Sequence, residues 1–293
     1  MIECPACGAV TATWDWVHGC ASCAFKVEKI DDFEAWAPEL AKVSSGEFFD
    51  PEIFKELVSL ENSNFWFQAR NELILWALKH YFGRPTRFAE IGCGTGFVLS
   101  AVEKALPHAE IYGTELFIKG LQFAAQRCAR AKLVQLDARR IPFREHFDVI
   151  GIFDVLEHIE DDEAVLTQIG KALVPGGGLL ITVPQHQWLW SPVDDAARHV
   201  RRYSAAELQS KVIAAGFEIL RSTSFVSFLL LAMLAARLGS RKPAGEAAAE
   251  LRLNKYLNSV FRYISVAEYG LIRRGINFAV GGSRLLVARR KSG

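Results

Sequence analysis

The sequence has almost no net charge. Its 34 Lys and Arg residues stand against 33 Asp and Glu residues, which gives a formal net charge of +1. Such a balance is not typical of a strongly basic nucleic-acid-binding protein or of a chain with an acidic tail. The balance nevertheless conceals an uneven distribution, because residues 237–293 hold twelve basic and three acidic residues, a local charge of +9. The other residues carry −8, so the basic C-terminal segment requires its own explanation.

The sequence also lacks the composition of a disordered chain, a secretory leader and a long apolar run. Half of its residues (51%) are hydrophobic, which is enough for a sizeable core. The chain starts Met-Ile-Glu-Cys-Pro, without a basic start or an apolar stretch, so we expect a cytoplasmic protein. The longest uncharged apolar run lies between Arg221 and Arg237 and is shorter than the roughly 20 residues of a membrane-spanning helix. It is predicted to be a buried helix, with an interfacial helix or the wall of an apolar pocket as alternatives.

Cysteine is sparse except near the N-terminus, where four of the six cysteines form two C-x-x-C pairs, Cys4/Cys7 and Cys20/Cys23. In a reducing compartment such pairs favour a tetrahedral thiolate site over disulfides, because each pair presents two sulfurs to one ion. Zinc is the expected metal. Four sulfur ligands leave no position for water or substrate, so the site is predicted to be structural. A Cys3His variant with His18 and redox-active dithiols are the alternatives, but no βαβ pattern surrounds the pairs.

Between the cysteine pairs and the basic segment, the apolar pattern indicates an α/β protein. Residues 31–50 are expected to form a linker with short helical pieces, and residues 51–82 have the spacing of two helices. From Arg87, short apolar runs alternate with helical stretches, which favours a parallel sheet covered on both faces. The predicted strands are 88–91, 111–114, 133–136, 147–153, 179–183, 217–220 and 284–288, with helices at 97–106, 116–129, 161–173 and 205–215. A doubly wound sheet binds its ligand at the carboxyl ends of its strands.

A glycine-rich segment follows the first predicted strand of this sheet. It reads Ala-Glu-Ile-Gly-Cys-Gly-Thr-Gly, and its glycines are Gly92, Gly94 and Gly96. Glycines at alternate positions let the backbone turn sharply and approach a ligand without interference from Cβ atoms. A dinucleotide fingerprint would place its third glycine at residue 97, which is Phe97. The G-x-G-x-G spacing, led by Glu90, instead resembles the class I S-adenosylmethionine-dependent methyltransferases.

Three further strand ends match the same family pattern in order and spacing. The second strand ends at Glu115, where the family's acidic side chain accepts hydrogen bonds from ribose hydroxyls, and the third ends at Asp137, where a carboxylate meets the adenine amine. The fourth ends at Asp154, and a Pro-Gly-Gly-Gly segment enters the fifth. The resemblance covers about residues 61–224. It implies that S-adenosylmethionine is bound by Arg70, Glu90, Gly92, Gly94, Gly96, Glu115, Leu116, Asp137, Ala138 and Asp154.

The resemblance also implies a fold and a domain organisation. The expected fold is a Rossmann-like α/β methyltransferase sheet of seven strands in the order 3-2-1-4-5-7-6, preceded by the zinc ribbon. Strands six and seven form a tight hairpin in the basic fold, whereas here about residues 225–281 separate them, which predicts a helical insertion. We therefore expect a zinc ribbon at 1–30, a linker and lid helices at 31–84, a cofactor-binding core at 85–224, a helical cap at 225–280 and a final core strand at 281–293.

The implied reaction transfers the sulfonium methyl group of the cofactor to a nucleophile by in-line displacement, so the protein mainly aligns the reactants and removes a proton from a hydroxyl acceptor. The candidate catalytic residues are His158, just after the fourth strand, and His199 and Tyr203 of a His-Val-Arg-Arg-Tyr segment. Structural roles in packing or in a surface loop are the alternatives. Asp154, Glu157 and His158 also resemble the acidic-x-x-Glu-His magnesium site of ubiquinone-biosynthetic O-methyltransferases, but Asp at the first position disfavours Mg2+.

The favoured function is methyl transfer to a small or lipophilic acceptor, with oxygen as the preferred acceptor atom. A zinc-ribbon RNA methyltransferase is the enzymatic alternative, and the absence of Lys and Arg from the first 23 residues argues against this nucleic-acid partner. A noncatalytic cofactor-binding scaffold with a protein-binding ribbon is the alternative of another class. Peripheral membrane contact through residues 224–236 and the basic C-terminal segment is a separate hypothesis.

Overall fold

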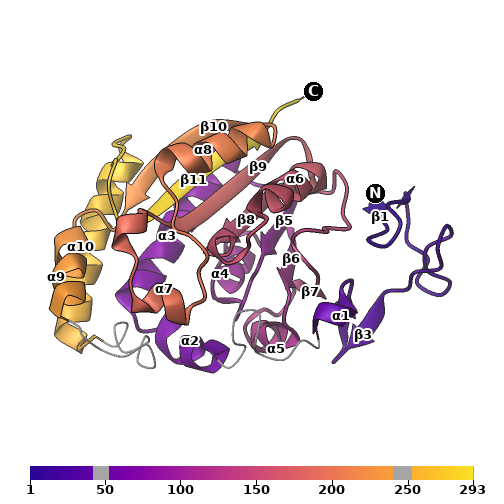
Figure 1. Cartoon of the computed structure of the whole chain (residues 1–293), viewed down its shortest axis with the longest axis horizontal. Coiled ribbons are helices and arrows are strands. Elements are labelled where there is room, and N and C mark those ends of the chain that lie inside the picture. The colour runs from indigo at the N-terminus through magenta and orange to yellow at the C-terminus, as the bar shows by residue number, and fades with distance from the viewer. Residues whose placement is uncertain (42–52, 240–252, 293) are drawn as a thin grey trace.

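The computed structural model describes residues 1–41, 53–239 and 253–292, and its centre is a sheet in which nine strands of these ranges take part (Figure 1). The strand order is β10-β11-β9-β8-β5-β6-β7-β4-β3. From β9 to β4 neighbouring strands are parallel, whereas β10, β11 and β3 run antiparallel to their neighbours. Numbered along the chain, β5 to β11 lie in the order 3-2-1-4-5-7-6. Their bounds are Arg87–Ile91, Glu110–Glu115, Lys132–Gln135, Phe147–Phe153, Leu173–Pro184, Phe217–Phe225 and Ser283–Arg290.

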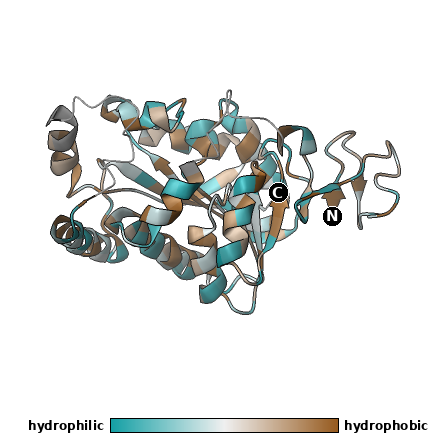
Figure 2. Cartoon of the chain, turned by 90° about the horizontal axis from the view of Figure 1, so that it is seen from below, coloured by the Kyte–Doolittle hydropathy of each residue, from teal (hydrophilic) through white to brown (hydrophobic). Residues whose placement is uncertain are grey.

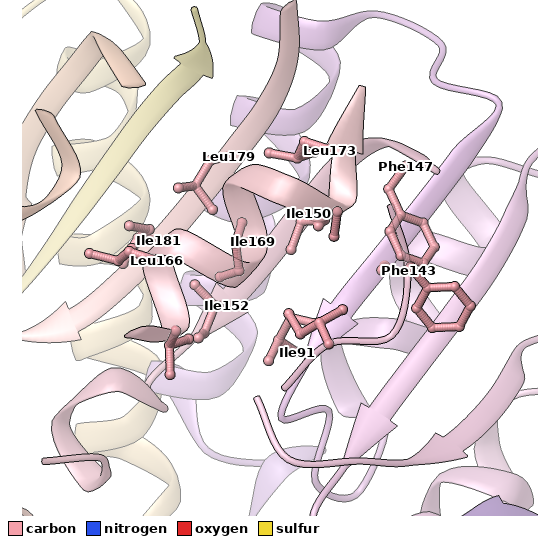
Figure 3. Packing of buried hydrophobic residues seen from close by; sticks show 14 of the residues in the cluster. Ile91, Phe143, Phe147, Ile150, Ile152, Leu166, Ile169, Leu173, Leu179 and Ile181 are labelled. Carbon is pink, nitrogen blue, oxygen red and sulfur yellow. The ribbon is translucent and has the colours of Figure 1, made fainter. Parts of the chain in front are cut away.

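Helices cover both faces of this sheet, because successive residues of each strand point to opposite sides and both sides are apolar. Ile150 and Ile152 of β8 face one layer, where Leu166 and Ile169 of α6 pack against them (Figure 3). Val149 of the same strand faces the other layer. The first layer contains α6 (Asp162–Ala172) and α8 (Ala205–Ala214); the second contains α3 (Phe65–Phe82), α4 (Phe97–Ala105), α5 (Ile118–Arg127) and α10 (Lys255–Arg273). The four helices predicted within the core are confirmed to within two residues at each end.

The N-terminal segment adds to the sheet, which the sequence did not predict. The strands β1 (Ile2–Glu3) and β2 (Val10–Thr11) form a separate pair, and β3 (Glu28–Ile30) and β4 (Phe33–Ala35) continue the main sheet beyond β7. Residues 31–35, expected within a linker, therefore belong to a hairpin. The side chain of Gln135 fixes the next residues, because it exchanges hydrogen bonds with the backbone of Ala37 in front of the short helix α1 (Pro38–Ala41). The cysteine-bearing segment extends beyond the edge of the sheet that β4 and β3 form (Figures 1 and 2).

Among the described residues, the helices α9 (Leu230–Gly239) and α10 lie between β10 and β11 in the chain, and both are found at the left of Figure 1. The apolar run at 224–236 was predicted to be one helix, but it begins within β10 and becomes helical only at Leu230. The helix α10 packs on α3, where the rings of Phe65 and Phe261 lie 5.3 Å apart. Large apolar side chains remain exposed on this part of the molecule, namely Phe228, Leu231, Tyr256, Val260 and Tyr263. None of the described helices is long and apolar enough to cross a membrane.

The remaining helices lie at the carboxyl edge of the parallel strands. The helix α2 (Ile53–Glu61) precedes α3, and α7 (Pro192–Ala196) follows β9. Two short 3-10 helices, Leu156–His158 and Gln187–Leu189, follow β8 and β9. In Figure 1, α2, α5 and α7 are found together below the sheet. Residues 42–52, part of the predicted linker and lid region, lie outside the described residues.

Candidate cofactor and acceptor site

The glycine-rich loop connects β5 to α4 and is shaped by close packing. The φ angles of Gly92, Gly94 and Gly96 are +70°, +50° and +75°. A Cβ atom on Gly92 would lie 2.5 Å from Cγ2 of Val155, and one on Gly96 would lie 2.9 Å from the backbone of Ala124. The loop therefore needs glycine for both its conformation and its neighbours.

Glu115, at the end of β6, is bonded to this loop. One carboxylate oxygen accepts the N–H of Gly94 (2.9 Å), and the other accepts the N–H of Leu116 (2.8 Å) and of Phe117 (3.3 Å). Burial raises the pKa of Glu115, while these three donors favour its charged form. Because a carboxylate has about four lone-pair sites, Glu115 can still accept a hydrogen bond from a ribose hydroxyl. The residue thus orders the loop and remains available to a ligand.

Two further predicted carboxylates lie at neighbouring strand ends. Glu90 is buried, burial raises its pKa well above the ordinary value, and its Oε2 atom has no hydrogen-bond partner among the described residues. A buried acceptor without a donor is costly, so this atom fits a ligand that brings an N–H or O–H group. Asp137 accepts the backbone N–H of Arg139 (2.9 Å) and its guanidinium, and Ala138 packs against the core. The carboxylate acceptors around the loop fit S-adenosylmethionine, whose amine, ribose hydroxyl and adenine amine groups donate hydrogen bonds.

Arg70 and Asp154 form an ion pair at the carboxyl end of β8. Arg70 comes from α3, is buried, and lies over the ring of Trp66 at 4.5 Å from its centroid. Asp154 has a φ of +54° and also accepts a hydrogen bond from the hydroxyl of Thr182 (3.1 Å). Its carboxylate is therefore already engaged by a cation. This pairing differs from the magnesium triad considered from the sequence, in which Asp154 would join Glu157 and His158.

The three side chains that could bind a metal at this edge are Glu157, His158 and His199. Their ligand atoms lie within 4.8 Å of one another. The two imidazole rings, which the sequence places 41 residues apart, have centroids 4.7 Å apart. The Nδ1 atom of His199 is 2.8 Å from Oδ1 of Asp194, and the backbone of Val200 donates to the carbonyl of Glu157 (2.8 Å). Two candidate bases from separate motifs thus belong to one cluster.

The third candidate catalytic residue, Tyr203, has a different environment. It is completely buried, and its hydroxyl donates to Oδ2 of Asp162 (2.6 Å). Lys211 and Arg201 bind the same carboxylate, at 2.7 and 2.5 Å. Burial and the Asp162 charge raise the pKa of Tyr203. This placement favours the structural alternative, in which Tyr203 stabilises the packing of α6 and α8, and argues against contact with an acceptor.

The comparisons with known proteins agree with this geometry. Residues 89–179 match a family model described as a methyltransferase domain. A Mycolicibacterium smegmatis protein named "Probable S-adenosylmethionine-dependent methyltransferase" is 27% identical over 170 residues, which cover 56% of this chain and 64% of the relative. A protein of the same description from Mycobacterium tuberculosis H37Rv is 24% identical over 167 residues, with 56% and 59% covered. The chain contains a class I S-adenosylmethionine-dependent methyltransferase domain.

Solved structures share the fold of this methyltransferase domain. The [4+2]-cyclase SpnF is 21% identical, with 78% of this chain and 84% of that chain covered and a TM-score of 0.54. A SAM-dependent methyltransferase from Thermotoga maritima is 17% identical, with 82% and 99% covered and a TM-score of 0.52. At such identities the likeness concerns the fold alone. The chain also spans less than two thirds of the length of the two curated relatives described above.

The sulfur atoms of the four N-terminal cysteines, which precede the methyltransferase domain in the sequence, lie close together. The Sγ atoms of Cys4 and Cys23, and those of Cys7 and Cys20, are 3.6 Å apart, and all four lie within 4.8 Å of one another. A disulfide would need about 2.05 Å. Zinc–sulfur bonds of about 2.3 Å in a tetrahedron place the sulfurs about 3.8 Å apart, so the four thiols fit one zinc ion.

Helix α2 supplies residues of the methyltransferase domain that the sequence did not single out. The ring of Phe54 approaches the loop, because a Cβ atom on Gly94 would lie 3.5 Å from it and one on Gly120 would lie 3.1 Å from it. Glu61 accepts hydrogen bonds from the hydroxyl of Thr95 (2.7 Å) and from Arg127 (2.5 Å). The sequence indicated only that Phe54 lies on a helix, through its apolar spacing. No sequence pattern indicated that Glu61 contacts the loop.

Proposed function

We propose that this protein transfers the methyl group of S-adenosylmethionine to a small or lipophilic acceptor. The observation that supports the proposal most is the joint arrangement of the glycine-rich loop with Glu90, Glu115 and Asp137 at three adjacent strand ends. The carboxyl edge of a doubly wound sheet, where these residues lie, is where this architecture binds nucleotides. When bound, the cofactor supplies an activated methyl group.

The chain's own residues would bind and orient the two reactants. The backbone of the loop would approach the cofactor, Glu115 would accept its ribose hydroxyls, and Asp137 would meet the adenine amine. Glu90 offers its unpartnered oxygen to the amino group. The Arg70–Asp154 ion pair lies near Glu157, and we place the acceptor at the cluster of Glu157, His158 and His199. Helix α2, which Glu61 holds to the loop, would exclude water from the cofactor side.

The zinc ribbon is part of the same proposal. Four converging thiols at one end of the sheet would hold a structural Zn2+, with no open coordination position for chemistry. Trp14 beside these cysteines packs on Trp36, which lies next to β4, with ring centroids 4.9 Å apart. The metal would therefore stabilise the segment that extends the sheet.

A transfer assay distinguishes this function from its alternatives. The full-length chain would be incubated with radiolabelled S-adenosylmethionine and an extract of its source cells, and the extract then fractionated. We expect label in the small-molecule or lipid fraction, and its loss in an Asp137→Ala variant. Label in an RNA fraction that is lost on ribonuclease treatment would support the RNA alternative instead. Binding of the cofactor without any transfer would support the scaffold.

Several basic residues of the C-terminal segment have intramolecular partners, which weakens the case for RNA. Arg262 pairs with Glu72, Arg290 pairs with Glu145 (3.1 Å), and Arg284 is buried. These three arginines contribute to packing within the chain, so their charges are not available to bind phosphate groups. Membrane contact stays a prediction: the exposed apolar residues of α9 and α10 motivate it, and flotation with anionic vesicles tests it.

A further inference from the structure

We propose that Glu157, His158 and His199 form a second metal site, which binds a divalent transition metal at the acceptor side of the sheet. The three residues come from two segments, the 3-10 helix after β8 and the loop after α7. One ligand atom from each lies within 4.8 Å of the other two. The site is separate from the four cysteines, and it goes beyond methyl transfer because metal binding can be measured without any acceptor.

Glu157 supplies the first argument. Its side chain is completely buried, and neither carboxylate oxygen has a hydrogen-bond partner among the described residues. A buried carboxylate with no donor is strongly unfavourable, and a bound cation removes that cost. Nearby guanidinium groups do not fill this role, since Arg70 is bound to Asp154 and Arg202 is bound to Asp194.

His199 supplies the second argument, because its ring is oriented by a carboxylate. Asp194 is itself buried, and besides Nδ1 of His199 it accepts hydrogen bonds from the backbone of Ser191 (2.8 Å) and from Nε of Arg202 (2.7 Å). A carboxylate on one imidazole nitrogen fixes the tautomer and leaves the other nitrogen as a ligand, as in carboxylate–histidine–metal arrangements. Asp194 is thus a positioning residue for the proposed site.

The position of His158 completes the ligand set. Its ring stands at 79° to that of His199, with 4.7 Å between centroids, and the backbone of Ala197 and Arg198 holds it from the loop side. The hydrogen bond from Val200 N to Glu157 O joins the two segments directly behind the ligands. Asp194 and the loop backbone therefore orient the two imidazole rings, and the main-chain bond holds Glu157 beside them.

The ligand types indicate the class of metal. Two imidazoles and one carboxylate suit zinc, iron, cobalt or manganese, whereas magnesium prefers oxygen ligands throughout. Three protein ligands leave at least one coordination position for a water or for an oxygen of the acceptor. With a metal bound, both histidines would be ligands and would not act as proton acceptors.

Metal content of the purified full-length chain tests this proposal. After incubation with Zn2+ and removal of free metal, we expect two ions per wild-type chain, by inductively coupled plasma mass spectrometry. The Glu157→Gln and His199→Ala variants should each hold one ion, as should a Cys7→Ser/Cys23→Ser variant. The surface variant His108→Ala is the matched control and should keep two. Circular dichroism would verify that each variant is folded.

Cobalt substitution gives a second readout that separates the two sites. Cobalt bound by cysteine shows sulfur-to-metal charge-transfer absorption, whereas cobalt bound by nitrogen and oxygen shows only ligand-field bands. The Cys7→Ser/Cys23→Ser variant should retain ligand-field bands, and additional replacement of His199 should remove them. A cysteine variant that binds neither zinc nor cobalt, or a wild-type stoichiometry of one that Glu157→Gln leaves unchanged, would overturn the proposal. Affinity for S-adenosylhomocysteine, measured on the same samples, reports separately on the proposed function.

Discussion

Glu61 on α2 and Thr95 in the glycine-rich loop are hydrogen-bonded, with Thr95 Oγ1 2.7 Å from Glu61 Oε1. Arg127 at the end of α5 donates to both of these residues, at 2.5 Å to Glu61 and 2.9 Å to Thr95. Three elements that are far apart in the sequence therefore meet at the loop that is proposed to bind the cofactor. The position of α2 over the loop depends on this buried polar contact.

Glu61→Gln is expected to weaken cofactor binding. The substitution keeps the shape of the side chain but leaves the Arg127 guanidinium without its anionic partner, a loss of about 1–2 kcal/mol. We predict a roughly fivefold to thirtyfold lower affinity for S-adenosylhomocysteine in titration calorimetry. The exposed Ser59→Ala on the same helix is the control. Equal affinities for wild type and Glu61→Gln would show that α2 has no part in the site.

Gly92→Ala is expected to disrupt the loop by two separate effects. The residue has a positive φ, and its new methyl group would lie 2.5 Å from Val155. Gly83 has a similar φ of +65° with nothing within 4 Å of a Cβ atom, so Gly83→Ala isolates the backbone cost of about 1 kcal/mol. Urea unfolding should show a larger loss for Gly92→Ala. Adding Val155→Ala should recover part of the difference, and no recovery would contradict the steric explanation.

Removal of the ribbon metal should act locally. We predict that a Cys20→Ser variant, or a strong chelator, makes the N-terminal segment sensitive to trypsin at Lys26 and Lys29, because metal ligation organises a segment with little core of its own. Affinity for S-adenosylhomocysteine should stay within about threefold, since distant sites act independently. Ser22→Ala is the control for proteolysis. A large loss of cofactor affinity would instead indicate that the ribbon supports the cofactor site.

The half-buried ring of His146 should make the free energy of unfolding depend on pH. It stacks on Phe143, and burial together with Arg87 lowers its pKa from 6.5 to about 4. Between pH 6.5 and 4 the imidazole is therefore protonated in the unfolded chain but neutral in the folded chain. The free energy of unfolding is highest above pH 6.5 and falls between pH 6.5 and 4. For a half-buried group we expect a fall of about 1–2 kcal/mol. In His146→Gln, the pH profile from urea unfolding should be flatter by that amount; an unchanged slope would contradict the assignment.

The sequence predicted the core strands and the glycine-rich loop because their signals are local. Alternating apolar residues and closely spaced glycines act through neighbours in the chain. The strands β3 and β4 were missed because three residues give no readable period, and the predicted helix at 224–236 failed because β10 continues to Phe225. The meeting of His158 with His199, and of Arg70 with Asp154, depends on how distant segments pack. A single sequence contains no record of such pairs.

The most direct test of the account is titration calorimetry of the full-length chain with S-adenosylhomocysteine. We predict one binding site per chain, and an affinity at least tenfold lower in Glu115→Gln, because the charge that accepts the ribose hydrogen bonds is lost. Glu110→Gln, at the opposite and exposed end of β6, should bind like wild type. The absence of binding to the folded wild-type chain, or equal affinities in all three proteins, would contradict the proposed cofactor site.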